Sequence, residues 1–321
     1  MTPDQAGQFI DFHHQRLSGL VIEAVTQKLL RLEPDSLKII LSLPEALIHP
    51  TTRRWFVRVA LKMDAAKVIP IVVEALSHPD WRIFQVSADI LTGLGMEARE
   101  PLLEKLHNCP CAVGRTNAIS CLHRLADPFH YLQIADASLV PHIAEAAADP
   151  SPKVRATADE ALSKSEARSA EAVIVRALDD PEPAVRRQAI RGCGRLGFGS
   201  GAEKLIGLLG SPDATVRADA ASALDRIGDV RAAGAVRNLL NDADGYVRWT
   251  AATALIRLWE ADNIPALGRA ADDPEPMVAI AALEALARKA PDQAKDSLAQ
   301  AAENPHWGIQ DTGRHYLAAL P

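Results

Sequence analysis

The segment DPEPAVRRQAIRGCGRLG, residues 180–197, recurs with variations along the chain and decides the fold. Its valine belongs to a column of apolar residues spaced 31 positions apart: Val154, Val185, Val216, Val247, Val278 and Ile309. An arginine follows each of the first four. A period of this length with helical spacing inside each unit is typical of a solenoid, whose repeats bury their apolar faces against their neighbours. We therefore expect an all-α structure, an alpha-alpha superhelix of about nine helical pairs.

Each repeat is expected to hold two helices, the first within residues 180–197 and the second over roughly Ala202 to Leu209. An aspartate side chain accepts a free amide of the first helical turn, and proline lacks that amide. We therefore expect Asp before Pro to cap the first helices, as at Asp149, Asp180 and Asp273.

Columns of small and apolar residues predict the core. Four positions after the valine stand Ala158, Ala189, Ala220, Ala251 and Ala282, and eight positions after it stand Leu162, Cys193, Leu224, Leu255 and Leu286. Small residues allow neighbouring helices to approach closely, at separations of about 8 to 10 Å. These columns are expected to form one continuous core.

Degenerate copies extend the array toward the N-terminus, with Arg53, Ile83 and Gly114 at the valine position, which places nine first helices. The step from Gly114 to Val154 is 40 residues, so a nine-residue insertion is expected near 127–136, between two helices of one repeat. We divide the chain into an N-terminal helical cap (1–48), the repeat array (49–304) and a C-terminal capping helix (305–321).

Composition favours a soluble, cytoplasmic, non-secreted protein. The net charge of −6 argues against a generally basic nucleic-acid coat, although a local basic face is compatible with it. The N-terminus lacks the pattern of a signal peptide, and no apolar run is long enough to span a membrane. Four cysteines at irregular spacings do not suggest a disulfide framework.

The pattern D-P-x-x-x-V-R-x-x-A-x-x-A-L-x-x-[LI]-G resembles HEAT repeats, and more narrowly the short HEAT-like repeats of phycobilin lyase subunits, over about 49–321. The resemblance implies a right-handed superhelix with the valine-bearing helices on its concave side. It also implies a ladder between repeats, made by the Asp and Arg that flank each turn: Asp149 and Arg155, Asp180 and Arg186, Asp242 and Arg248. Ala279 replaces the arginine and would end the ladder.

Catalytic motifs are missing from the sequence. HEAT-repeat hydroxylases carry His-Glu dipeptides, and this chain has none; HEAT-like DNA glycosylases match only in general character. The run Gly192–Gly197 fits G-x-G-x-x-G, but no strand is expected before it, so we interpret its glycines as aids to close packing and helix termination. We expect no cofactor and no assembled nucleophile and base.

A column of cations stands ten positions after the valine: Arg124, Lys164, Arg195, Arg226, Arg257 and Arg288. One interpretation is that each cation complements the dipole of its own helix, worth about 0.3 to 1 kcal/mol. The other is an electropositive groove of roughly 50 Å for an acidic protein segment or a phosphate backbone.

Aromatic residues gather near the start of the first helices. Trp55 and Trp249 stand two positions after the valine position, Trp81 and Trp307 two before it, and Tyr246 and Met277 one before it. Since Trp, Tyr, Met and Arg are enriched at interface centres, Tyr246, Trp249, Arg187, Arg191 and Arg257 are the predicted binding hot spot. Burial of individual tryptophans in the core is the alternative.

His107, Cys109, Cys111, Cys121 and His123 suggest a metal or redox site. Thiolates and imidazoles are zinc ligands, but Cys-x-Cys lacks the gap of a zinc knuckle, and Cys121 and His123 face different ways on one helix. We therefore predict no metal site and treat the cysteines as small apolar fillers.

The leading hypothesis is a non-catalytic scaffold or adaptor that binds a protein partner with an acidic segment on its concave face. Two alternatives stay open: a bilin-lyase-like or other enzyme-assisting subunit that cradles an anionic ligand, and a nucleic-acid binder with a basic groove. No membrane association is expected.

Overall fold

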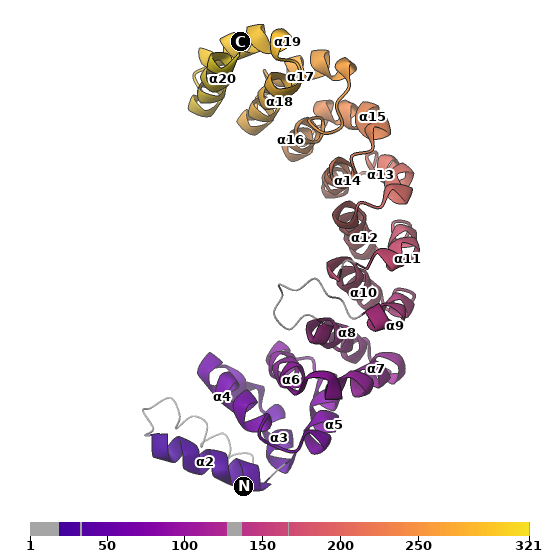
Figure 1. Ribbon diagram of the computed structural model, residues 1–321, viewed down its shortest axis with the longest axis vertical. Helices are drawn as coiled ribbons and strands as arrows, with labels where there is room; N and C mark the ends of the chain where they lie inside the picture. The colour runs from indigo at the N-terminus through magenta and orange to yellow at the C-terminus, as the bar shows by residue number, and fades with distance from the viewer. Residues whose placement is uncertain (1–18, 33, 127–136, 166, 321) are drawn as a thin grey trace. The chain divides into compact units, whose positions relative to one another are not determined.

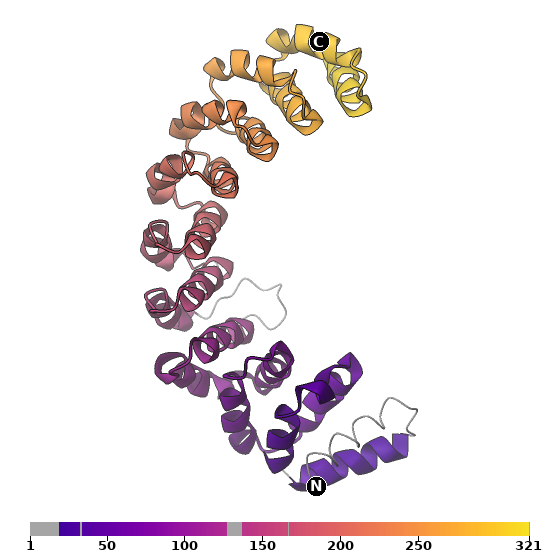
Figure 2. The same ribbon diagram turned by 180° about the vertical axis from the view of Figure 1, so that it is seen from behind.

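The computed structural model describes residues 19–32, 34–126, 137–165 and 167–320. Within these ranges the regular secondary structure is helical and no strand occurs. The chain folds as two compact units, Met1–Ala167 and Arg168–Pro321. Figures 1 and 2 show the helical pairs of each unit from opposite sides. None of the described helices combines the length and apolar character needed to cross a membrane.

The first unit contains the helices before residue 168, and consecutive first helices pack against one another, as α6 does on α8 and α8 on α10. Their bounds are α2 (Gly19–Leu32), α3 (Pro34–Leu41), α4 (Pro50–Ala60), α5 (Ala65–Ala75), α6 (Trp81–Leu94), α7 (Arg99–Asn108), α8 (Ala112–Ala126), α9 (Val140–Ala146) and α10 (Pro152–Lys164).

The second unit continues the alternation. Its helices are α11 (Glu171–Ala177), α12 (Pro183–Leu196), α13 (Ala202–Leu208), α14 (Ala214–Ile227), α15 (Ala233–Asn238), α16 (Gly245–Ala254), α17 (Ile264–Ala270), α18 (Pro276–Lys289), α19 (Pro291–Ala302) and α20 (Trp307–Ala319). The helices α12, α14, α16, α18 and α20 pack in sequence to form one layer, on the inner side of the curve of this unit (Figure 1). The remaining helices form the other layer.

The predicted all-α solenoid is confirmed. The expected first helices are α4, α6, α8, α10, α12, α14, α16, α18 and α20, and the expected second helix at 202–209 is α13. The predicted insertion at 127–136 lies outside the described residues. Helices α2 and α3 occupy the predicted N-terminal cap region, and α20 occupies the predicted C-terminal one.

The predicted core columns are buried. Val154, Val185 and Val247 have no exposed surface, and the same holds for Leu162 and Leu224. Because these positions recur from repeat to repeat, successive helical pairs contribute equivalent apolar side chains to the interior of their own unit. Burial of each such side chain contributes about 1.5 to 3 kcal/mol.

The predicted role of the aspartate before proline is wrong at Asp149, Asp180 and Asp273. Helix α12 begins at Pro183 with Glu182 as its N-cap, and the Asp180 side chain instead accepts the Glu182 amide at 2.9 Å. The helices α10 and α18 begin in the same way, three residues after their aspartates. A second proline occupies the first helical position there, so the aspartate shapes the turn before the helix.

The ladder implied by the resemblance is present, with the arginine as its connecting group. Arg217 donates through Nη1 to the carbonyl of Ser211 in its own turn at 2.9 Å, and through Nε and Nη2 to Asp242 of the next turn, both at 2.7 Å. Arg248 makes the same contacts with the Asp242 carbonyl and with Asp273. Each arginine therefore ties one turn to the next.

Arg115 and Asp149 form the corresponding pair in the first unit, with an Nε–Oδ2 distance of 2.7 Å. One rung has a different composition. Arg186 donates to the carbonyls of Asp180 and Pro181 in its own turn, but Ser211 stands in the next turn where other repeats have aspartate.

Removing the charge of one rung should destabilise the second unit. Asp242→Asn keeps a side-chain acceptor for the turn but weakens the paired hydrogen bonds from Arg217, so we expect a loss of about 1.5 to 3 kcal/mol in a urea unfolding experiment at neutral pH. Asp262→Asn, at an exposed aspartate before α17, is the matched control and should leave the midpoint unchanged.

The effect of Asp242→Asn should depend on pH. The hydrogen bond from Arg217 lowers the pKa of Asp242 below its ordinary value. The charged aspartate therefore stabilises the fold above the unfolded-state pKa of about 3.9, and this contribution is lost as the pH falls through the lower folded-state pKa. A difference between wild type and variant that grows in acid would contradict this assignment.

Candidate functional site

The predicted cation column divides between the two units. Arg195, Arg226, Arg257 and Arg288 stand at or just beyond the C-terminal ends of α12, α14, α16 and α18, and all four are exposed. Arg124 and Lys164 hold equivalent positions on α8 and α10 of the first unit. Each unit therefore presents its own short row of cations.

Both cations of the first unit are neutralised by carboxylates. The Arg124 guanidinium contacts Asp89 at 2.6 Å, and the Lys164 ammonium contacts Glu160 at 2.6 Å. Both cations line a pocket of about 440 Å³ between α8 and α10. Because each charge already has a partner, this pocket has little net positive potential.

Two cations of the second unit also have partners. Arg257 lies 3.7 Å from Asp225, and Arg288 donates to the hydroxyl of Tyr316 at 3.3 Å. Arg288 additionally lies 3.9 Å from Glu284. These contacts are long and solvent-exposed, so they reduce the charge of the row without holding the side chains rigidly.

Arg195 and Arg226 differ from the rest of the row. Within the described part of the chain, their guanidinium groups form no ion pair, and both are exposed. Together with Arg191 and Ser222 they line a pocket of about 200 Å³ between α12 and α14. We refer to these four residues as the arginine pocket.

Asp219 is the acidic side chain of this pocket and faces two cations. Its Oδ2 atom lies 3.5 Å from Arg187 Nε and 3.5 Å from Arg191 Nη2. Neither the Arg187 Nε atom nor Asp219 Oδ2 has a hydrogen-bonding partner, although both are buried. One carboxylate is therefore shared loosely among several guanidinium groups, which leaves the pocket with an excess of positive charge.

Gly194 explains why α12 and α14 lie close enough to form the pocket. A Cβ atom at this position would come within 2.8 Å of the Ala223 Cα atom, so only glycine fits without displacing a backbone. Gly197 has a φ of 70° and ends α12 in the left-handed conformation. The glycines of the G-x-G-x-x-G run thus serve close packing and helix termination, as the sequence suggested.

The aromatic residues occupy the opposite end of the same helical layer. Tyr246, Met277 and Trp307 lie at the N-terminal ends of α16, α18 and α20 and expose 61%, 60% and 77% of their surface. The half-buried Trp249 contacts Tyr246, with ring centroids 5.4 Å apart. Arg257 stands eleven residues after Tyr246 and three residues beyond the last residue of α16. The layer therefore has an aromatic end and a cationic end.

The two tryptophans of the first unit make contacts with other side chains of that unit. Trp55 donates its indole N–H to the Thr26 hydroxyl at 3.2 Å. Trp81 is 64% exposed, and the Arg53 guanidinium lies 5.4 Å from its ring centroid. A cation over the ring face shields part of this aromatic surface.

The sequence matches the profile of HEAT repeats over residues 170–256 and 235–318. Residues 170–318 contain HEAT repeats. These matches fall in the second unit, where the arginine pocket and the Tyr246–Trp249 pair lie. A comparison with curated proteins finds no match.

Solved structures share the HEAT-like architecture. The Escherichia coli protein YibA is 17% identical with a TM-score of 0.56, and the alignment covers 82% of this chain and 95% of that one. The complex of CpcE and CpcF of phycocyanin lyase from Nostoc sp. PCC7120 is 17% identical with a TM-score of 0.43, covering 69% and 94%. An engineered protein is 20% identical with a TM-score of 0.45, covering 69% and 95%. Of these, only the likeness to YibA has a TM-score above 0.5, and at 17% identity it supports the fold alone.

The cysteines of the first unit fall into two chemical environments. Burial raises the pKa of Cys121 to about 12, which disfavours its thiolate form. Cys109 and Cys111 instead lie with their sulfur atoms 3.4 Å apart beside a pocket of about 560 Å³. Burial raises the pKa of Cys111, but hydrogen bonds from the Gly114 amide, Ser77 and Cys109 outweigh it, and the net pKa is lowered.

Cys111 should therefore be the more reactive of these thiols. At neutral pH we expect iodoacetamide to modify Cys111 on the order of tenfold faster than Cys121, because the thiolate is the nucleophile. Peptide mass spectrometry of quenched time points measures both rates. In urea the two rates should converge, and equal rates in the native protein would contradict the assignment.

Proposed function

We propose that the chain is a non-catalytic HEAT-repeat scaffold that binds an acidic segment of a partner protein on the α12–α16 face of its second unit. Solenoids present extended surfaces of this kind to their partners. In this proposal the arginine pocket supplies the charge contacts, Arg187 adds to them, and the Tyr246–Trp249 pair supplies apolar contact.

The observation that carries the proposal is the pair of exposed guanidinium groups at Arg195 and Arg226, which have no acidic partner in the described chain and converge with Arg191 on one pocket. A guanidinium group binds a carboxylate through two parallel hydrogen bonds, and such bonds are about twice as strong as neutral ones. The Ser222 hydroxyl is a further donor on the pocket wall.

The pattern of charge compensation favours a short acidic segment over a long phosphate backbone. Arg257 and Arg288 continue the row, but each already has a partner within its own unit. A duplex would need a track of uncommitted cations along several repeats. The pocket between α12 and α14 matches one or two carboxylates instead.

The chemistry of the pocket supports binding without catalysis. No histidine or thiol is among the residues that line it, and the carboxylate of Asp219 faces Arg187 and Arg191. Apolar side chains of the partner would pack against Tyr246 and Trp249, since aromatic and arginine side chains commonly form the centre of protein interfaces.

Charge reversal tests this proposal. We expect a fluorescein-labelled oligoglutamate peptide to bind the wild-type protein at low salt, and Arg195→Glu with Arg226→Glu to weaken binding more than tenfold, because each lost charged hydrogen bond is worth about 1.5 to 3 kcal/mol. Fluorescence anisotropy measures the affinity.

The control makes the same charge change on the other helical layer, with Arg269→Glu on α17 and Lys295→Glu on α19, both exposed. This variant should bind nearly as well as wild type. Equal weakening by both pairs would show nonspecific attraction, and tighter binding of duplex DNA, with a salt slope near −0.9 per phosphate, would replace the proposal with nucleic-acid binding.

A further inference from the structure

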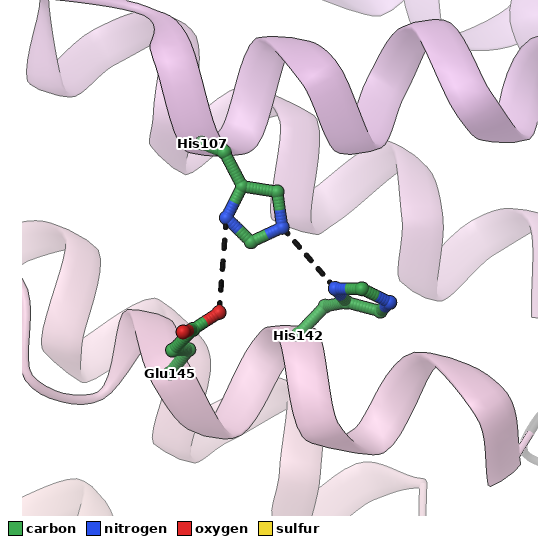
Figure 3. A group of neighbouring side chains, drawn as sticks. All are labelled: His107, His142 and Glu145. Atoms are coloured by element: carbon green, nitrogen blue, oxygen red, sulfur yellow. Dashed lines mark hydrogen bonds and ion pairs between the residues drawn. The ribbon is translucent and has the colours of Figure 1, made fainter.

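Three potential metal ligands meet between α7 and α9 in the first unit. His107 belongs to the last turn of α7, and His142 and Glu145 belong to α9 (Figure 3). His107 Nε2 lies 3.2 Å from His142 Nδ1, and His107 Nδ1 lies 3.8 Å from Glu145 Oε2. One ligand atom from each residue can be chosen so that all three lie within 4.8 Å of one another.

The sequence pattern did not point to this cluster, because along the chain His107 stands close to cysteines and far from His142 and Glu145. His107 and His142 are 35 residues apart and lie on the second helices of two successive repeats, α7 and α9. Residues on equivalent second helices become neighbours only when the repeats stack. The spacing of three between His142 and Glu145 places both on one face of α9.

The backbone that carries these side chains is well anchored. Leu106, beside His107, is 4% exposed, and Ile143, beside His142, is 3% exposed. The three polar side chains project outward from this anchored edge, with His107 and Glu145 exposed and His142 half-buried. A ligand can therefore reach them without opening the core.

The geometry is close to what a tetrahedral ion requires. Zinc binds imidazole nitrogen at about 2.0 to 2.1 Å and carboxylate oxygen at about 2.0 to 2.2 Å, so two ligand atoms of one tetrahedron lie roughly 3.4 Å apart. The two histidine nitrogens already have this separation. Glu145 Oε2 faces Nδ1, the other ring nitrogen of His107, so the exposed Glu145 side chain has to rotate toward Nε2 to take the third position.

We propose that His107, His142 and Glu145 bind a zinc ion that links α7 to α9. Two imidazoles and one carboxylate are a donor set suited to this ion, and the fourth position is left to water. The ion would join second helices of two successive repeats. This site is independent of the arginine pocket, which lies in the other unit.

Titration of the full-length, chelator-treated protein with zinc chloride tests the proposal. By calorimetry we expect one equivalent to bind the wild type. His142→Gln and Glu145→Gln should each lower the affinity at least tenfold. His315→Gln, at an exposed histidine of α20, is the matched control and should bind like the wild type.

The neighbouring thiols need a separate variant, since thiolates also bind zinc. The double variant Cys109→Ser with Cys111→Ser should retain the affinity, and cobalt substituted into the wild type should show a tetrahedral spectrum without thiolate charge transfer. Circular dichroism confirms that each variant is folded. The proposal is overturned if the wild type binds no zinc, if His142→Gln binds as tightly as the wild type, or if the cysteine variant loses the site.

Discussion

Burial of one valine per repeat against its neighbours is the constraint on which the rest of the structure depends. Val185 and its equivalents have almost no exposed surface, and the arginine that follows four of these valines is thereby held at the turn. From that position it satisfies carbonyls of its own turn and reaches the aspartate of the next. Core packing and the ladder are therefore two results of the same register.

In the same register, the outward positions of the first helices belong neither to the apolar core nor to the arginine–aspartate ladder. In α12 these positions carry Arg187, Arg191 and Arg195, spaced by four residues along one helical face. Where α14 contributes acidic residues, as at Asp219, the charge is shared; where it contributes Arg226, the charge is left available. The positive charge available for binding is therefore concentrated between α12 and α14.

The sequence predicted the features that recur in every repeat, and it did not predict contacts between individual side chains. The period identified the fold, the buried columns and the helices, because each rests on a pattern that recurs. The pairing of Arg124 with Asp89, or of His107 with His142, joins side chains of neighbouring repeats at positions that are not the same from one repeat to the next. The helix starts were misplaced because a second proline moves the first turn onward, as at Pro183.

Ser211 has a consequence for how α12 is joined to α14. It stands where several other repeats place the aspartate that receives the two hydrogen bonds of an arginine, so this junction relies on apolar packing, on the close contact of Gly194 with Ala223, and on the long ion pairs of Asp219 with Arg187 and Arg191. A carboxylate held between Arg195 of α12 and Arg226 of α14 would connect the two helices at a place where the arginine–aspartate rung is missing.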